Sequence, residues 1–284
     1  MKTNRLLQQA SLQLQAAGCD APRLDAELLL MFAWKVSRTD LIIRAHGPVP
    51  APIAEDFETY ISRRTNREPL AYILGEKEFW SRPFRVCPDV LIPRPETEHL
   101  IEAVLAAFPD RNGAYRFCDI GTGSGCIAVT LACEYPNANI VASDLSDAAL
   151  QVATQNAHTH QVSQRITFRQ GDMFAAIADS SEFHAIISNP PYVSKAEMHD
   201  LEQELAREPR SALTDEQDGL SFLATILDNA PRYLQPNGYI ILETGLCGLP
   251  ATPDNLTYQQ LIIDLAGQLR GGIYQYSGTH YDQR

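Results

Sequence analysis

Four consecutive residues in the second half of the chain, Asn189-Pro190-Pro191-Tyr192, have the chemistry to hold a planar NH2 group. Two successive prolines fix the backbone and remove two N–H donors, so the carbonyl of Pro190 can point into a cavity. The side-chain oxygen of Asn189 and this carbonyl then form a pair of acceptors for one NH2 group. The ring of Tyr192 offers a face for an amide or a base. Pro-Pro alone would indicate a rigid turn, but the flanking Asn and Tyr favour a substrate site.

A glycine-rich segment upstream is typical of a ligand-binding loop. It follows a predicted strand and precedes a predicted helix, and its alternating glycines let the backbone turn tightly and approach a ligand. Nicotinamide and flavin enzymes use similar loops, so the loop alone does not identify the ligand. The candidate cofactor-binding residues here are Asp119, Gly121, Thr122, Gly123, Ser124 and Gly125.

Two acidic residues follow the next predicted strands and narrow the choice of ligand. Asp144 ends the second strand, where a carboxylate can accept hydrogen bonds from both hydroxyls of a ribose. Asp172 ends the third strand, where it can bind an adenine amino group while Met173 or Phe174 packs on the ring. A lone Asp after a strand is usually a turn residue. Two of them beside a glycine loop predict a nucleoside-containing cofactor.

These segments need a scaffold that brings several strand ends together, and the rest of the pattern predicts one. From Tyr115 onward, short apolar runs alternate with segments of helical periodicity. This alternation predicts a mostly parallel sheet with helices on both faces. The predicted strands cover residues 115–120, 139–143, 165–169, 184–188 and 239–243, and the predicted helices cover residues 124–134, 146–157 and 219–234.

The first part of the chain is predicted to be a small helical bundle. Helical periodicity over residues 6–17 ends at Gly18, and Pro22 suits the first turn of a second helix. A third helix is predicted from about residue 53 to residue 65. A bundle of this size has little core of its own, so we expect it to form an accessory domain over residues 1–70.

A change of pattern after the bundle predicts a β-hairpin linker over residues 71–90. Extended pieces are expected at residues 72–75, 78–80 and 84–86, with a turn at Ser81-Arg82. Four prolines between residues 83 and 95 exclude a continuous helix there. The remaining residues, 91–284, are then expected to form the α/β domain.

The overall composition is that of a soluble globular protein and disfavours nucleic acid as a partner. The net charge is −12, whereas proteins that follow a phosphate backbone usually carry a basic face. The densest basic cluster, Arg63-Arg64 with Arg67, is expected to be a solvated helix face. No apolar run approaches the roughly 20 residues that span a bilayer, and no secretion signal is recognised, so we expect a cytoplasmic protein.

Cysteine and histidine patterns predict neither disulfides nor a metal site. The six cysteines form no C-x-x-C pair, and several lie in apolar segments, as buried reduced thiols do. The seven histidines show no ligand spacing.

Further motifs accompany the glycine loop and Asn-Pro-Pro-Tyr. Residues 91–98 read Leu-Ile-Pro-Arg-Pro-Glu-Thr-Glu, a segment that is specific when combined with residues 189–192. With these motifs the chain resembles the peptide chain release factor glutamine methyltransferases, the HemK/PrmC family, over most of its length, from residue 22 to residue 243. The other shared segments are residues 22–29, 68–73, 208–209, 212–213 and 218–220.

The resemblance implies a fold, a cofactor and a substrate. The fold would be a seven-stranded, mostly parallel, Rossmann-like class I methyltransferase sheet, with an N-terminal helical domain that helps to dock the protein substrate. The cofactor would be S-adenosyl-L-methionine, contacted by residues 121–125, Asp144, Met173 and Asn189. The substrate would be the glutamine of the Gly-Gly-Gln motif in class 1 peptide chain release factors. Catalysis would rest on Asn189, Pro190 and Tyr192, with Pro191 completing the glutamine site.

The end of the chain departs from the family pattern. After Glu243 the family has a helix and two closing strands, but Pro250 and Pro253 interrupt any helix here. The last stretch, residues 271–284, shows no clear strand pair. We therefore expect an altered closing edge of the sheet.

Two other functions fit part of the pattern. An adenine-specific DNA or RNA amino-methyltransferase would use the same acceptor pair, but it needs base flipping and a basic recognition surface. A catalytically inactive cofactor-binding protein that serves as an interaction partner is the other, and the intact Asn189, Pro190 and Tyr192 disfavour it.

Overall fold

The computed structural model describes residues 1–180, 182–199, 201 and 203–278. The chain forms two compact units, and each is described by itself. The first contains residues 1–76 and a short segment that ends at Arg207, and the second contains the rest of the chain from Lys77 onward.

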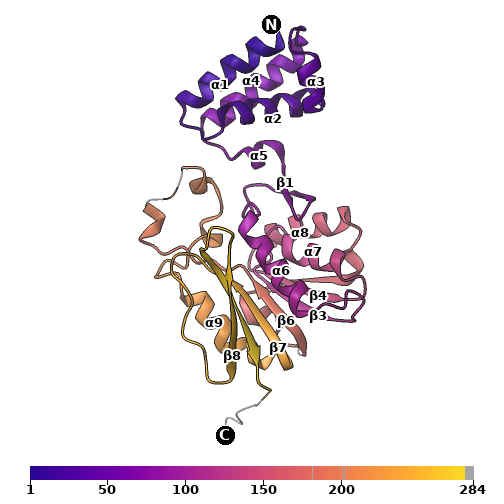
Figure 1. Ribbon diagram of the computed structural model, residues 1–284, viewed down its shortest axis with the longest axis vertical. Helices are drawn as coiled ribbons and strands as arrows, with labels where there is room; N and C mark the ends of the chain where they lie inside the picture. Colours follow the sequence, from indigo (N-terminus) through magenta and orange to yellow (C-terminus); the bar gives the residue numbers. More distant parts are fainter. Residues whose placement is uncertain (181, 200, 202, 279–284) are drawn as a thin grey trace. The chain divides into compact units, whose positions relative to one another are not determined.

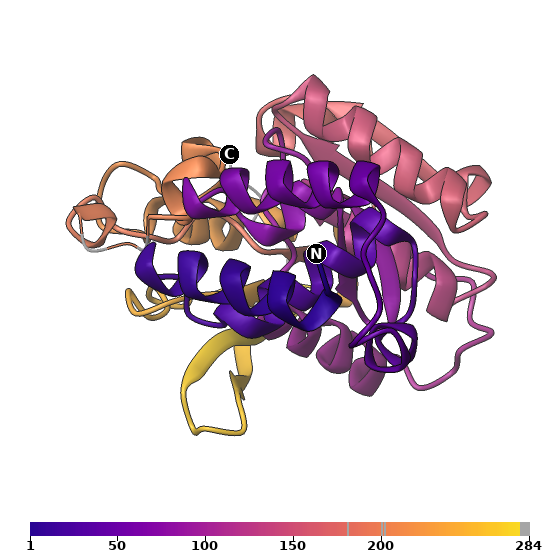
Figure 2. The same ribbon diagram turned by 90° about the horizontal axis from the view of Figure 1, so that it is seen from above.

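The first unit is a helical bundle, as predicted. Helix α2 (Pro22–Trp34) packs against both α1 (Thr3–Ala16) and α4 (Ala51–Thr65) around a core rich in leucine (Figures 1 and 2). The predicted signals act as expected: Gly18 follows α1 with a φ of +76°, and Pro22 is the first residue of α2.

Two short helices of this unit were not predicted. In α3 (Arg38–Ile43), the Ser37 side chain accepts from the Asp40 backbone N–H and the Asp40 carboxylate accepts from the Ser37 backbone, a capping box. Helix α5 (Leu70–Leu74) follows Pro69 and ends at Gly75, whose φ is +76°. The extended structure predicted for residues 72–74 is therefore wrong, because a proline and a left-handed glycine delimit one helical turn.

The basic cluster in α4 is not a solvated face, which corrects the sequence interpretation. Arg64 is only 5% exposed, and its Nε donates to the carboxylate of Asp25 in α2 at 2.8 Å. A second carboxylate, on Glu204, lies 2.8 Å from Arg64 and 3.1 Å from Arg67. Burial of a guanidinium requires such pairing, so these arginines hold the first unit together.

The predicted hairpin forms, and its turn lies one residue earlier than the predicted Ser81-Arg82. Strand β1 (Glu76–Phe79) pairs with β2 (Arg82–Arg85). The two loop residues are Trp80 and Ser81, with φ values of +52° and +56°. Two consecutive positive φ angles fit a two-residue hairpin turn that matches strand twist.

The second unit contains a seven-stranded sheet, which confirms the predicted fold class. Its strand order is β5-β4-β3-β6-β7-β9-β8 (Figure 1). Pairings among the first five of these strands are parallel, and β9 is antiparallel to both of its neighbours. The strands are β3 (Arg116–Ile120), β4 (Asn139–Asp144), β5 (Ile166–Gln170), β6 (Phe183–Ser188), β7 (Leu234–Glu243), β8 (Leu256–Ile263) and β9 (Leu269–Tyr276).

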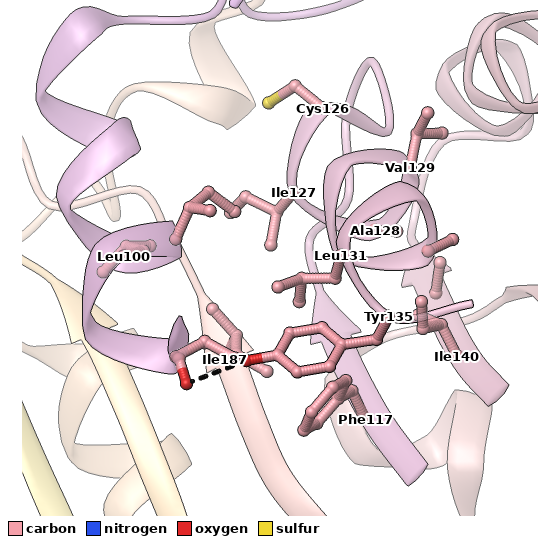
Figure 3. Packing of buried hydrophobic residues seen from close by; sticks show 14 of the residues in the cluster. Leu100, Phe117, Cys126, Ile127, Ala128, Val129, Leu131, Tyr135, Ile140 and Ile187 are labelled. Carbon is pink, nitrogen blue, oxygen red and sulfur yellow. Dashed lines mark hydrogen bonds between the residues drawn. The ribbon is translucent and has the colours of Figure 1, made fainter. Parts of the chain in front are cut away.

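Helices cover both faces of this sheet. Alternate residues of each strand point to opposite sides, so that Phe117 belongs to one core and its neighbour Cys118 to the other. The first core contains α6 (Glu98–Ala107), α7 (Cys126–Glu134) and the end of α8 (Asp147–Thr159), and the second contains α9 (Ser221–Asn229). Figure 3 shows Leu100, Ile127 and Tyr135 in the first of these cores. Burial of each such large side chain contributes roughly 1.5–3 kcal/mol.

The closing edge of the sheet is complete, so the prediction of an altered edge over residues 271–284 is wrong. Strand β9 (Leu269–Tyr276) pairs with β7 and β8. Its pattern is hidden in the sequence because Gly271 and Gly272 are weak strand formers and a register shift between Tyr258 and Gln260 breaks the alternation in β8. Residues 279–284 lie outside the described residues. As predicted, no helix forms over residues 245–255, all of which are described.

The long helix predicted over residues 219–234 is shorter than expected. Helix α9 ends at Asn229, a short 3-10 turn (Ala230–Arg232) follows, and Leu234 already belongs to β7. Pro231 explains this, because a proline cannot donate to the preceding helical turn.

Candidate active site

A cavity of about 620 Å³ lies in the second unit, at the carboxyl ends of the central strands. This is where open parallel sheets bind their ligands. The segments predicted to carry chemistry meet there, although they come from four different strand ends. The lining includes Ile120, Gly121, Gly123, Ser143, Asp144, Gly171, Asp172, Met173, Asn189, Pro190 and Pro191, together with residues 89–91 and 209–212.

The glycine loop leaves room for a ligand on one side and packs closely on the other. Gly121 and Gly123 have φ values of +73° and +54°, and a Cβ on either would meet no atom within 4 Å. By contrast, a Cβ on Gly125 would lie 3.0 Å from that of Ala153 in α8. The first two glycines thus open the cavity, and the third lets α7 approach α8.

Asp119 holds the glycine loop by hydrogen bonds, and its side chain does not line the cavity. Its side chain is fully buried and accepts hydrogen bonds from the hydroxyl of Thr122 at 2.6 Å and the N–H of Ala128 at 3.2 Å. Burial raises the pKa of Asp119 to about 7, although both hydrogen bonds lower it. Thr122, Ser124 and Gly125 also lie outside the lining of the cavity, so direct cofactor contacts of these four residues stay predictions.

Asp144 lines the cavity at the end of β4. One carboxylate oxygen accepts from the backbone N–H of Gly123 at 2.8 Å, and the other accepts from the N–H of Ser146 at 2.9 Å. Each carboxylate oxygen has a second lone pair. Asp144 can therefore hold the glycine loop and still accept hydrogen bonds from a ligand.

The third strand end presents Asp172 and Met173 to the cavity. Met173 has a φ of +44°, an uncommon conformation for a non-glycine residue that turns the chain sharply after Gly171. The next residue, Phe174, is buried and stacks on Tyr233 with ring centroids 5.1 Å apart. Of the two candidates for an apolar contact with a base, Met173 is the one at the cavity.

The Asn-Pro-Pro-Tyr segment follows β6, and three of its residues line the same cavity. Nδ2 of Asn189 donates to the hydroxyl of Thr97 at 3.1 Å. Because this nitrogen is engaged, Oδ1 of Asn189 is the amide atom left to accept from a ligand. Tyr192 does not line the cavity. Its hydroxyl donates to the carboxylate of Glu243 at 2.9 Å, and burial raises the pKa of Tyr192, so the phenol stays protonated.

Comparison with known proteins identifies the family. Residues 5–75 match the family model described as PrmC N-terminal domain, and residues 97–219 match the model described as Methyltransferase small domain. The chain is 45% identical to the Release factor glutamine methyltransferase of Nitratidesulfovibrio vulgaris, over 84% of this chain and 81% of that protein. The protein of that name from Vibrio cholerae is 37% identical over 95% of both chains. This chain belongs to the release factor glutamine methyltransferase family.

The chain is also similar to solved structures of methyltransferases. A methyltransferase from Pyrococcus furiosus is 15% identical and covers 78% of this chain and 100% of its own length, with a TM-score of 0.47. The sequence similarity to the named relatives makes the chain an S-adenosylmethionine-dependent methyltransferase.

The methyltransferase has a cavity wall that the sequence patterns did not assign. Glu208 is buried, accepts from the N–H of Ile92 at 2.9 Å and pairs with the guanidinium of Arg94. It thereby joins residues 89–91 to residues 209–212 on the lining. Each segment overlaps residues shared with the family, but no local pattern indicates that the two segments are paired.

No group of three or more metal-ligating side chains occurs within the residues that the structure describes. In the same residues, no helix has both the length and the apolar character to cross a membrane. All six cysteines, Cys19, Cys87, Cys118, Cys126, Cys133 and Cys247, have free thiols.

Proposed function

We propose that this methyltransferase transfers a methyl group from S-adenosyl-L-methionine to the side-chain amide nitrogen of the glutamine in the Gly-Gly-Gln motif of class 1 peptide chain release factors. The names of relatives at 37–45% identity support this substrate. The observation that carries the proposal is a single cavity lined by Gly121, Asp144, Asn189 and Pro190. The residues proposed to bind the nucleoside and the two proposed acceptors for the NH2 group therefore line the same cavity.

The proposed cofactor site uses the open side of the glycine loop. The absence of any atom within 4 Å of a Cβ on Gly121 or Gly123 is consistent with a ligand close to the backbone. Asp144 would accept from the ribose hydroxyls, and Asp172 with Met173 would hold the adenine. When bound, S-adenosylmethionine supplies an electrophilic methyl group on a sulfonium.

The proposed glutamine site explains why an unreactive amide could be methylated. An amide nitrogen is a poor nucleophile, because its lone pair is delocalised into the carbonyl. Oδ1 of Asn189 and the carbonyl of Pro190 would accept from the two N–H bonds of the substrate and favour a more pyramidal nitrogen. Alignment of this kind in a space that excludes water can supply much of the acceleration. The contact of Tyr192 with the amide stays a prediction, since Tyr192 does not line the cavity.

The other parts of the chain receive roles that follow from this substrate. We propose that the N-terminal helical domain, residues 1–70, helps to dock the release factor, that residues 71–90 link the domains and that residues 91–284 carry catalysis. A cytoplasmic location follows, since release factors act there in translation termination. Nucleic acid is not the proposed substrate, in keeping with the net charge of −12.

Methyl transfer from labelled S-adenosylmethionine to a purified class 1 release factor tests the proposal. The matched substrate control is a release factor in which the Gly-Gly-Gln glutamine is replaced, and DNA is offered in a parallel reaction. Label on the wild-type factor alone is the expected result. Label on DNA, or equal label on both release factors, would contradict the proposed substrate.

A further inference from the structure

Thr97 connects the start of α6 to the proposed glutamine site. It ends the 3-10 turn Pro95–Thr97 and is only 2% exposed. Its hydroxyl oxygen accepts the hydrogen bond from Nδ2 of Asn189 at 3.1 Å. Thr97 does not line the cavity, whereas Asn189 does. A substitution of Thr97 should therefore affect a bound ligand through the orientation of the Asn189 side chain.

Glu243 holds Tyr192, at the other end of the segment 189–192, as Thr97 holds Asn189. It lies at the end of β7, is 1% exposed, and accepts from the Tyr192 hydroxyl at 2.9 Å. Its second oxygen, Oε2, has no hydrogen-bond partner within the described part of the chain. The ring of Tyr192 is also held by packing, because a Cβ on Gly245 would lie 2.7 Å from its Cδ2 atom.

The two contacts converge on one buried carboxyl group. Burial raises the pKa of Glu243 to about 7, while the hydroxyls of Thr97 and Tyr192 lower it by hydrogen bonding. Of the charged groups nearby, Glu96 raises this pKa and Arg270 lowers it. A threonine hydroxyl that donates its hydrogen to a carboxylate can only accept from another partner. The 3.1 Å contact has the matching polarity, because Nδ2 of Asn189 donates and the Thr97 oxygen accepts.

We propose that Thr97 and Glu243 are positioning residues for methyl transfer, which fix the amide orientation of Asn189 and the ring of Tyr192. The inference rests on the proposed function and extends it to side chains behind the cavity wall. Glu243 does not line the cavity, so its role is to orient other groups and not to receive the proton of the substrate. With the Asn189 amide in this orientation, its oxygen faces the substrate. In the reverse orientation, its NH2 would meet the NH2 of the glutamine.

Substitution of Thr97 by valine tests this inference, because valine keeps the shape of threonine and removes the hydroxyl. We expect Thr97→Val to lower kcat for release factor methylation about 10- to 100-fold. The affinity for S-adenosylmethionine should stay unchanged, since Thr97 does not line the cavity. Thr97→Ser restores the hydroxyl and should recover most of the rate. Glu243→Gln should also lower kcat without changing cofactor affinity.

A double substitution separates positioning from a general structural effect. If Thr97 acts through Asn189, then Thr97→Val should have no further effect on kcat in an Asn189→Ala background. Equal losses in both backgrounds, or a wild-type rate for Thr97→Val, would overturn the inference while the proposed function stands. No transfer to the release factor by the wild-type enzyme would overturn the proposed function and the inference with it. Far-UV circular dichroism establishes that each variant is folded.

Discussion

The carboxylate of Asp144 and the backbone N–H of Gly123 form a 2.8 Å hydrogen bond that joins the end of β4 to the glycine loop. The two residues come from neighbouring strand ends, and both line the cavity. The aspartate that is proposed to bind the ribose therefore also fixes the shape of the loop that is proposed to lie along the rest of the cofactor. Cofactor affinity should therefore depend on Asp144 in two ways, through the contact with the ribose and through the conformation of the loop.

Asp144→Ala is expected to weaken S-adenosylmethionine binding about 10- to 100-fold, because a charged hydrogen-bond acceptor contributes roughly 1.5–3 kcal/mol. Isothermal titration calorimetry measures this directly. Asn189→Ala is the matched comparison, and it should lower kcat far more than cofactor affinity. Unchanged affinity in Asp144→Ala would rule out the assignment of Asp144.

Glu208→Ala is expected to destabilise the second unit by about 2–3 kcal/mol. The substitution leaves the buried N–H of Ile92 and the guanidinium of Arg94 without their acceptor. Urea unfolding followed by circular dichroism gives the change in free energy. The control is Glu216→Ala, which breaks an exposed ion pair with Arg210 and should change the free energy of unfolding much less, because water screens such a pair. Equal effects of the two substitutions would show that Glu208 does not hold the cavity wall.

Gly245→Ala is expected to lower kcat and leave cofactor affinity intact. The added methyl group would lie 2.7 Å from Cδ2 of Tyr192, closer than packed carbon atoms come, so the ring must move. Gly113→Ala is a matched control, because its methyl group would also strike a ring, that of Tyr115, at 2.4 Å but away from the cavity lining. Steady-state kinetics give kcat for both variants. A wild-type kcat in Gly245→Ala would show that methyl transfer does not depend on the position of the Tyr192 ring.

Stability should fall as pH rises toward neutrality, in part because of Asp119. Its pKa of about 7 in the folded chain exceeds the ordinary value of 3.8, so the folded state binds the proton more tightly than the unfolded state does. The resulting stabilisation is fully present below the unfolded pKa and is lost as pH rises through the folded pKa. From about pH 5 to about pH 7.5 this group should cost about 2 kcal/mol.

Asp119→Asn provides the comparison for this pH effect, because its side chain cannot ionise. Urea unfolding at both pH values should show a smaller loss of stability in the variant than in the wild type. Glu243, whose pKa burial also raises to about 7, contributes to the loss that both proteins share. The same loss in variant and wild type would contradict a protonated Asp119 in the folded state.

The central part of the fold could be predicted from local patterns, because each element carries its own signals. The helix predicted over residues 146–157, for example, begins at Ser146, whose side chain accepts from the N–H of Ala149 and caps α8. The hairpin turn was predicted at Ser81-Arg82, and it lies one residue earlier, at Trp80-Ser81. Elements that depend on distant partners were missed: β9 contains Gly271 and Gly272, and its pairing with strands on both sides outweighs their low strand propensity.

Some residues of the candidate site could likewise be predicted from local patterns, and others could not. The residues that line the cavity at the strand ends belong to short contiguous motifs, so the sequence could indicate them. Thr97 lies 92 positions from Asn189 in the sequence, and Glu208 lies 116 positions from Ile92. A single sequence gives no sign of such pairings, because they arise only when the chain folds. Only the structure therefore identifies the residues that hold the cavity lining from outside the cavity.

Tandem mass spectrometry of the release factor after reaction tests the central claim most directly. Wild-type enzyme with S-adenosylmethionine should add one methyl group to the side-chain amide of the Gly-Gly-Gln glutamine, and Asn189→Ala should leave that glutamine almost unmodified while it still binds the cofactor. A methyl group on any other residue, or an unmodified glutamine with the folded wild-type enzyme, would contradict the account.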